Sequence, residues 1–277
     1  MKRTKIFLFF VLAASVLAAP LQDVYDEDLW KIPEFRDKVR SLHPFLANLY
    51  PVAVCKGDTL RIYEWDGNAA HYRFVKQVRP SFTVPEGIRA AFPLQEIDGR
   101  FACIVSPDVF DSQTGYVTIF HEFIHCYQGE TIEMALKMQL DVARTSMEKK
   151  DYMWELNYDF PYDDKRFGQV YSDFLNALRN DDDYAVIQTR KKLNQILNRH
   201  EYEYMIWQEW KEGFARFVEN LMRTSLGIPE NNNGQEPPYN RVSFYVGGAL
   251  LIEHLTRREP DLLTDIELLF HRILNVD

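Results

Sequence analysis

The segment GYVTIFHEFIHCYQ, residues 115–128, is predicted to form one helix that ends at Gly129. Apolar side chains surround nearly its whole circumference, which is typical of a helix in a protein core. His121, Glu122 and His125 are polar exceptions. Buried imidazole and carboxylate groups are costly unless they have partners. A bound metal ion is one such partner, and hydrogen bonds within the core are the alternative.

These three residues form an H-E-x-x-H motif. Residues four apart lie one turn from each other on the same helix face, so both imidazoles can reach one metal ion at about 2.0–2.1 Å. Glu122 lies at the edge of that face, where it can take a proton from an attacking water molecule. The motif predicts one zinc ion held by His121 and His125, with Glu122 as the general base of a metallopeptidase.

A catalytic zinc site usually has a third protein ligand and one open position. The best candidate is Glu212 in WKEGFARFVE, residues 210–219, with Glu209 and His200 as weaker rivals. Glu219 follows two turns later on the same face as Glu212. Its carboxylate can accept a hydrogen bond from a liganding imidazole and so support the site. The alternative is that both glutamates are solvated surface charges.

Together, H-E-x-x-H and E-G-F-A-x-x-x-E resemble the gluzincin metallopeptidases of the peptidase MA type, which include thermolysin-like enzymes and the zinc aminopeptidases. The aminopeptidases carry N-E-G-F-A, and Lys211 replaces the Asn here. The resemblance implies that Glu212 is the third zinc ligand and that Glu219 supports the site. It also implies a zincin-type catalytic domain that acts on a peptide or protein substrate.

A further part of the resemblance is YVGGALL, residues 245–251, which fits the Y-x-x-G-x-x-L helix of the aminopeptidases. The resemblance implies that Tyr245 stabilises the tetrahedral intermediate, and a phenol can donate a hydrogen bond to a developing oxyanion. A core tyrosine is the alternative, and Tyr239, Arg241 and His254 are other candidates for the same role.

Two features differ from the aminopeptidases. Glu212 follows His125 by 87 residues, so a helical insertion is predicted over about residues 130–200. The chain also has no segment like G-A-M-E-N, which binds the free amino terminus of a substrate in that group. The motifs therefore indicate zinc-dependent hydrolysis of peptide bonds without deciding between endopeptidase and exopeptidase.

Two other functions remain open. One is a non-catalytic, exported binding protein that keeps the zincin fold. The intact Glu122 argues against it, because a purely structural zinc site has no use for a general base. A deformylase-like amidohydrolase would use Cys103 as a ligand. Deformylases, however, carry Asp before the last His of the motif, where this chain has Ile124.

Outward from the motif, the chain divides into a strand-rich part and a helical part. Strands are predicted at Thr59–Trp65, His71–Val78, Ile88–Leu94 and Arg100–Val105. Helices are predicted at Asp26–Tyr50, Thr131–Lys149, Phe167–Arg179, Asp182–Asn198, Glu201–Leu226, Asn240–Arg257 and Pro260–Leu274. The fold class is α+β, a small mixed sheet with an edge strand followed by a mainly helical zincin-type domain. Arg100–Val105 is either that edge strand, open to an extended peptide, or an interior strand.

The first residues are predicted to be a cleaved signal peptide, residues 1–18. Three basic residues precede an apolar run at Ile6–Leu17, and two small residues follow it. The run is short for a spanning helix, so no stable membrane insertion is expected. The mature protein is then one domain, residues 19–277, secreted or periplasmic.

The net charge of −9 argues against binding to nucleic acid. The sequence does not indicate an oligomeric state. Of the three cysteines, Cys55 and Cys103 are the more plausible disulfide pair, because Cys126 lies in the metal-binding helix. Three buried thiols are the alternative.

Overall fold

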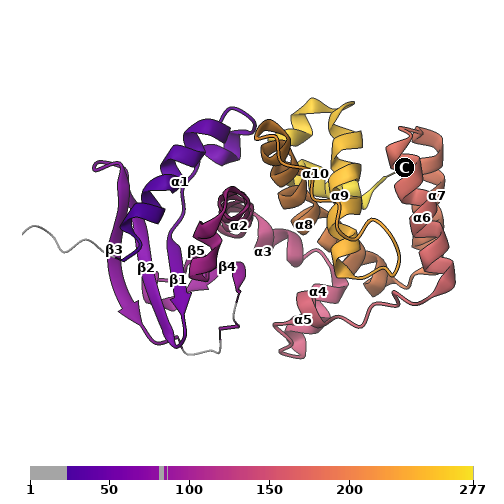
Figure 1. Cartoon of the computed structure of the whole chain (residues 1–277). Helices are drawn as coiled ribbons and strands as arrows, with labels where there is room; N and C mark the ends of the chain where they lie inside the picture. Colours follow the sequence, from indigo (N-terminus) through magenta and orange to yellow (C-terminus); the bar gives the residue numbers. More distant parts are fainter. Residues whose placement is uncertain (1–23, 81–83, 86, 277) are drawn as a thin grey trace, which may run out of the picture.

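The strand-rich part forms a five-stranded mixed sheet in the computed structural model, which describes residues 24–80, 84–85 and 87–276 (Figure 1). The strands are β1 (Val52–Lys56), β2 (Thr59–Asp66), β3 (His71–Val78), β4 (Arg89–Leu94) and β5 (Arg100–Val105). Their order is β3-β2-β1-β5-β4, with β1 and β5 parallel and the other neighbours antiparallel. Together with the helices, this sheet confirms the predicted α+β class.

The central strand β1 was not predicted from the sequence. Its first four residues, Val52–Cys55, are all buried. A strand covered on both faces lacks the alternation of polar and apolar residues that marks a half-exposed strand. The four predicted strands are present, with bounds that differ by one residue at most.

Strand β5 is an interior strand, hydrogen-bonded to β1 on one side and to β4 on the other. The prediction that Arg100–Val105 is an open edge strand is therefore wrong, and the interior alternative holds. The edge on this side is β4, and α2 (Gln113–Thr131) packs against both β4 and β5. Among the described residues, the edge strand that lies beside α2 is thus β4.

The predicted disulfide between Cys55 and Cys103 is not formed. All three cysteines are buried free thiols. Val52 of β1 pairs with Cys103, so Cys55, three residues further along β1, points to the opposite face of the sheet. Cys103 accordingly packs in the large core between sheet and helices, and Cys55 in the smaller core on the other face.

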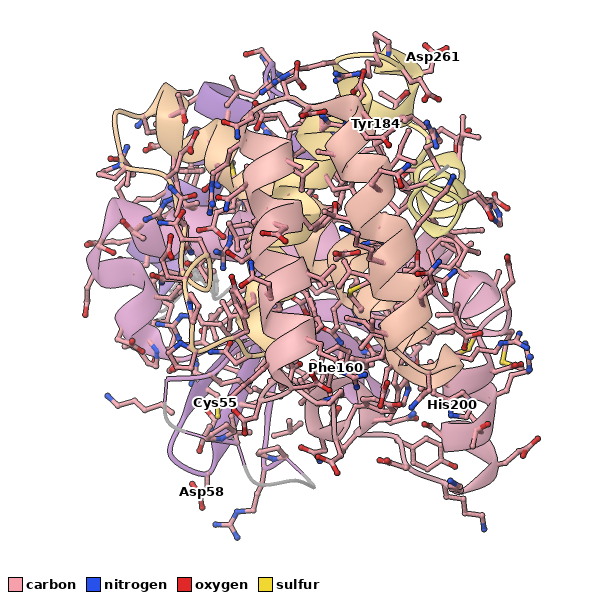
Figure 2. All side chains as sticks on the ribbon, turned by 90° about the vertical axis from the view of Figure 1, so that its right-hand side faces the viewer. Cys55, Asp58, Phe160, Tyr184, His200 and Asp261 are labelled. Carbon is pink, nitrogen blue, oxygen red and sulfur yellow. The ribbon has the colours of Figure 1, made fainter. Side chains whose placement is uncertain are left out.

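The other helices follow the predicted order with changed ends, except that the short α5 was not predicted. They are α1 (Asp26–Val39), α3 (Glu133–Lys137), α4 (Asp141–Glu148), α5 (Trp154–Asn157), α6 (Lys165–Arg179), α7 (Asp183–Ile196), α8 (Arg199–Ser225), α9 (Arg241–Thr256) and α10 (Ile266–Leu274). The predicted helix Asp26–Tyr50 ends at Val39, and Thr131–Lys149 divides into α3 and α4. Helices α6 and α7 lie on the side remote from the sheet, where Figure 2 shows the exposed Tyr184 near the start of α7.

Helix α2 lies between the sheet and the helical part of the molecule (Figure 1). Ser112 caps it by accepting a hydrogen bond from the Gly115 amide at 3.1 Å. Gly115 has to be small, because a Cβ atom there would lie 1.7 Å from the carbonyl oxygen of Val109. Gly129 does not end the helix, which continues to Thr131. Its small size instead admits the ring of Phe101, 2.2 Å from where a Cβ would be.

Helices α8 and α9 approach each other closely at two glycines. A Cβ on Gly213 would lie 2.6 Å from Cα of Gly248, and a Cβ on Gly248 would lie 2.2 Å from the carbonyl oxygen of Glu209. The start of α9 is fixed by a capping box between Asn240 and Ser243. This close contact brings the first turns of α9 beside Glu212 on α8.

The predicted signal peptide, residues 1–18, lies outside the described residues. Within the part that is described, no helix has both the length and the apolar character needed to cross a membrane.

Candidate metal centre

Three of the residues predicted to bind metal come together between two helices. His121 and His125 project from α2 and Glu212 from α8. One donor atom of each lies within 4.8 Å of the other two. Nε2 of His125 is 3.4 Å from Oε2 of Glu212, and Nε2 of His121 is 3.9 Å from the same oxygen. These residues form a group that can hold a metal ion.

The hydrogen bonds of the two imidazoles leave their Nε2 atoms free to bind a cation. Nδ1 of His121 donates to Glu219 at 3.0 Å, and Nδ1 of His125 donates to Oε1 of Gln128 at 2.9 Å. When both rings are neutral, each Nε2 carries a lone pair, and the two atoms face each other at 3.2 Å. The repulsion between these lone pairs is removed by a proton on one nitrogen or by a metal ion bound to both. Two ligands of a tetrahedral metal at about 2.0–2.1 Å are about 3.3 Å apart, which fits this separation.

Protons and metal ions compete for these atoms. Burial disfavours a charged imidazole, but the Glu212 carboxylate outweighs burial and raises the pKa of His125 to about 9. Burial acts against the Glu212 carboxylate too, yet the charges of His125 and His121 hold its pKa far below the usual value. Metal binding has to displace the proton, so metal affinity falls as the solution becomes more acidic.

Glu219 is placed to orient His121. Besides the Nδ1 of His121, its carboxylate accepts hydrogen bonds from Arg216 at 3.2 Å, Arg223 at 3.4 Å and Asn231 at 3.0 Å. Burial would raise its pKa, but the hydrogen bond to His121 and the adjacent charges lower it to about 2. Glu219 therefore stays ionised and accepts the hydrogen bond from Nδ1 of His121 over the whole neutral range.

Gln128 orients the second imidazole and was missed from the sequence. Its Nε2 donates to the main-chain carbonyl of Lys211 at 3.2 Å, which leaves Oε1 to accept from His125. The position of Gln128, three residues after His125 on a buried helix, is the signal that could have revealed it. The carbonyl it uses belongs to the residue before Glu212, so Gln128 links both ligand-bearing helices.

Glu122 lies beside the metal-binding group but is not part of it. Its side chain is buried, and burial raises the pKa of its carboxyl while the two imidazoles oppose that shift. A carboxylate whose pKa is raised toward the working pH is a better general base. Its place next to the ligands is the one that the motif predicts.

Tyr245 is one of two oxyanion candidates that lie at the site. Its ring packs against the guanidinium groups of Arg216 and Arg241, at 5.6 and 5.3 Å from the ring centre. Burial, the charge of Glu212 and a hydrogen bond to Glu212 together raise the pKa of its phenol. A phenol that keeps its proton can serve as a hydrogen-bond donor.

The remaining candidates differ in position. Tyr239 packs in the core against the rings of Phe167 and Tyr171. His254 lies at the other end of α9, where its two ring nitrogens are each 3.0 Å from an aspartate. Arg241, in contrast, lies at the site, with NH1 3.7 Å from Oε1 of Glu212.

The rival ligands do not reach the metal-binding group. Glu209 is fully buried on α8 and pairs with Arg190 at 2.6 Å. His200 is at the start of α8 (Figure 2), and the 12 residues between it and Glu212 span about 18 Å of helix. Cys103, the ligand expected for a deformylase, is likewise outside the group.

A cluster of four charges next to Glu212 was also missed. Nζ of Lys211 lies 3.0 Å from Glu133 and 2.9 Å from Glu155, and Lys137 pairs with the same two carboxylates. Trp207 donates its indole N–H to Glu155 at 2.9 Å. Glu133 and Lys137 belong to α3 and Glu155 to α5, so the cluster attaches the predicted insertion to α8.

This charge cluster is expected to make stability depend on acid. Burial disfavours the Glu155 carboxylate, but Lys211 and Lys137 outweigh it and lower the pKa to about 2. Because the unfolded value is about 4.3, the stabilisation is complete above pH 5 and is lost as the pH falls toward 2. Glu155→Gln should lower the free energy of unfolding by a few kcal/mol at pH 7, measured by urea denaturation. The difference from wild type should close below about pH 3.

The exposed Glu148, at the end of α4, provides the control for this series. Glu148→Gln should leave the free energy of unfolding unchanged within about 0.5 kcal/mol at every pH. If the free energies of unfolding of wild type and Glu155→Gln differed by the same amount at pH 7 and at pH 2.5, the lost stability would not come from the charge of Glu155.

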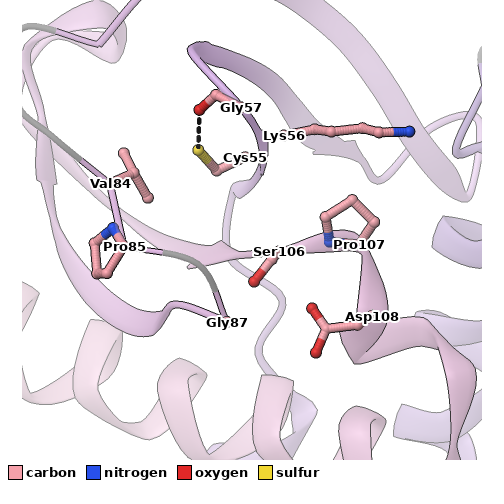
Figure 3. A pocket seen from close by; sticks show the side chains of 9 residues that line it. All are labelled: Cys55, Lys56, Gly57, Val84, Pro85, Gly87, Ser106, Pro107 and Asp108. Carbon is pink, nitrogen blue, oxygen red and sulfur yellow. Dashed lines mark hydrogen bonds between the residues drawn. The ribbon is translucent and has the colours of Figure 1, made fainter.

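One sizeable pocket lies away from the metal centre. Figure 3 shows it between Val84 and Pro85 on one side and Ser106 and Asp108 on the other. Its volume is about 660 Å³, and it includes the Cys55 thiol, which lies 3.8 Å from the carbonyl oxygen of Gly57. None of the metal-binding residues lines it, so it is not the place where a substrate would meet the metal.

The chain matches no model of a known protein family, and no curated protein or solved structure resembles it significantly. The likeness to gluzincins therefore rests on the motifs of this chain alone.

Proposed function

We propose that the chain is an exported zinc-dependent peptidase. The observation that carries the proposal is the convergence of His121, His125 and Glu212 with Glu122 beside them. Two imidazole nitrogens and one carboxylate oxygen are a common donor set for catalytic zinc. Export is proposed from the basic and apolar character of residues 2–17.

When bound, zinc supplies Lewis acidity and lowers the pKa of a water molecule in its open position. Glu122 takes the proton of the attacking water and delivers it to the leaving amine. Tyr245 donates a hydrogen bond to the oxyanion that develops on the scissile carbonyl. Glu219 and Gln128 hold the imidazoles in the orientation that the reaction needs.

The outer edge of β4 offers a way to hold an extended substrate, because it pairs with no other strand of the described residues. It lies beside α2, and an extended peptide could be added there as a further strand. The strand proposed to bind an extended substrate is therefore β4, Arg89–Leu94, in place of β5, Arg100–Val105.

The proposal is tested by digesting a peptide library with the zinc-loaded protein and identifying the products by mass spectrometry. We expect cleavage that stops on addition of a chelator and returns with zinc. Release of single terminal residues would identify an exopeptidase, and internal cuts an endopeptidase. A zinc-loaded protein that leaves the whole library intact would favour the non-catalytic binding protein.

A further inference from the structure

Arg241 differs from the other charged residues at the metal centre because its side-chain N–H groups donate no hydrogen bond to any described residue. Its one ion pair within the described residues is with Glu212 at 3.7 Å, too long for a hydrogen bond. Arg216, in contrast, donates to Glu219 at 3.2 Å and to the carbonyl of Asn231 at 2.9 Å. The guanidinium of Arg241 is therefore ready for an acceptor that the chain does not provide.

Arg241 is also the most accessible charged side chain of the site. Its side chain is 30% exposed, against 15% for Glu212 and 7% for Arg216. It is the first residue of α9, and the Asn240–Ser243 capping box fixes the main chain there. A molecule that approaches the metal from solvent would meet this group, held on a rigid helix end.

The ring of Tyr245 packs against the Arg241 guanidinium, which lies 5.3 Å from the ring centre. The same ring packs against the guanidinium of Arg216 at 5.6 Å. These ring contacts hold the guanidinium in place without using its N–H donors.

The charge balance around this point favours an anion. Glu219 is shared between Arg216 and Arg223, and Lys211 is matched by its own carboxylates, so neither group offsets Arg241. Of the residues that the structure describes, Glu212 is the one carboxylate that pairs with Arg241, and a divalent cation at the metal centre would offset its charge. The fork of N–H donors on a guanidinium matches the geometry of a planar carboxylate.

From this arrangement we infer that Arg241 binds a carboxylate of the peptide substrate. The inference rests on the proposed peptidase function. The Arg241 guanidinium lies 3.7 Å from Glu212, and each extended residue spans about 3.3–3.6 Å. A carboxylate bound to Arg241 would therefore lie only a few residues from the scissile bond. The group is either the C-terminal carboxylate of the substrate or an acidic side chain next to the cleaved bond.

The test measures binding without turnover. Calorimetry on zinc-loaded Glu122→Gln protein compares an acetylated tripeptide with a free C-terminus, its C-terminal amide, and internal peptides that carry Glu or Gln beside the target bond. One carboxylate peptide should bind about 10- to 100-fold more tightly than its neutral partner, as charge-assisted hydrogen bonds imply. Preference for the free C-terminus would identify the C-terminal carboxylate, and preference for Glu the side chain.

Adding Arg241→Gln should remove this preference, and Arg241→Lys should restore it only in part. The control is Arg257→Gln, which makes the same charge change just past the other end of α9 and should leave the preference intact. Equal affinity for all four peptides, or a preference that survives Arg241→Gln, would overturn the inference.

The outcome separates the inference from the proposed function. If the unmutated zinc protein cleaves peptides without any preference for a carboxylate, the inference alone fails. If Arg241→Gln lowers kcat equally for charged and neutral substrates and leaves KM unchanged, Arg241 acts on the oxyanion and the inference also fails. If the protein binds carboxylate peptides more tightly but cleaves no peptide, the proposed peptidase function is overturned and the carboxylate-binding site stands.

Discussion

Replacing Glu122 by Gln is expected to lower kcat/KM for peptide hydrolysis by at least about 10²–10⁴-fold, the contribution of a positioned general base. The amide has the same shape as the carboxylate but cannot take the proton of the attacking water. Glu122 is not among the three converging donors, so the zinc content should stay the same. Plasma emission spectroscopy for zinc and a fluorogenic peptide from the library digest measure the two effects.

The control for this substitution is Glu130→Gln. Glu130 lies on the same helix two turns further along and is exposed, so its removal makes the same change in net charge without touching the site. Its activity should equal that of the unmutated protein. Full activity of Glu122→Gln would exclude the mechanism, and loss of zinc from that variant would mean that Glu122 is a ligand.

The part of the site that lies on one helix was predictable from the sequence. The pitch of an α-helix alone places His121, Glu122 and His125 on adjoining faces, whatever the rest of the chain does. Glu212 required more, because it lies 87 residues further on and reaches the site only through the packing of α8 against α2. Its prediction depended on the metal needing a third ligand and on the E-G-F-A resemblance.

Other features depend on tertiary contacts that no local pattern shows. Strand β1 is buried on both faces, so its sequence carries no alternation. The disulfide prediction failed because pairing by elimination ignores which face of the sheet each cysteine occupies. Lys211 was read only as a departure from N-E-G-F-A, although its side chain binds α3 and α5 and its carbonyl positions Gln128.

The same contacts bear on the alternative of a non-catalytic binding protein. A structural metal site needs its ligands oriented, and Glu219 and Gln128 would serve that purpose equally well. Glu122 is different, because keeping a carboxylate buried beside two imidazoles costs free energy and adds no ligand. Catalysis would give this residue a function. The Glu122→Gln variant therefore discriminates between a peptidase and a non-catalytic binding protein.

Replacing Glu212 by Ala is expected to remove zinc from the purified protein. Two imidazoles and water remain as ligands, and the loss in affinity should exceed the roughly 10–100-fold that follows from losing a residue that only orients a ligand. Zinc binding also stabilises a folded protein, by about 2.7 kcal/mol when free zinc is 100-fold above Kd. The unmutated protein should therefore melt several degrees higher with zinc than with chelator, and Glu212→Ala should show no such difference at the same zinc concentration.

Two comparisons make this result specific to the ligand. His200→Ala removes the rival imidazole on the same helix and should keep both the zinc and the zinc-dependent rise in melting temperature. Glu219→Gln keeps a hydrogen-bond acceptor for His121 but loses the charge, so its zinc affinity should lie between those of Glu212→Ala and the unmutated protein. If Glu212→Ala retained full zinc content and melted like the unmutated protein, another group would have to complete the site. His121 and His125 would then share the metal ion with a third ligand other than Glu212.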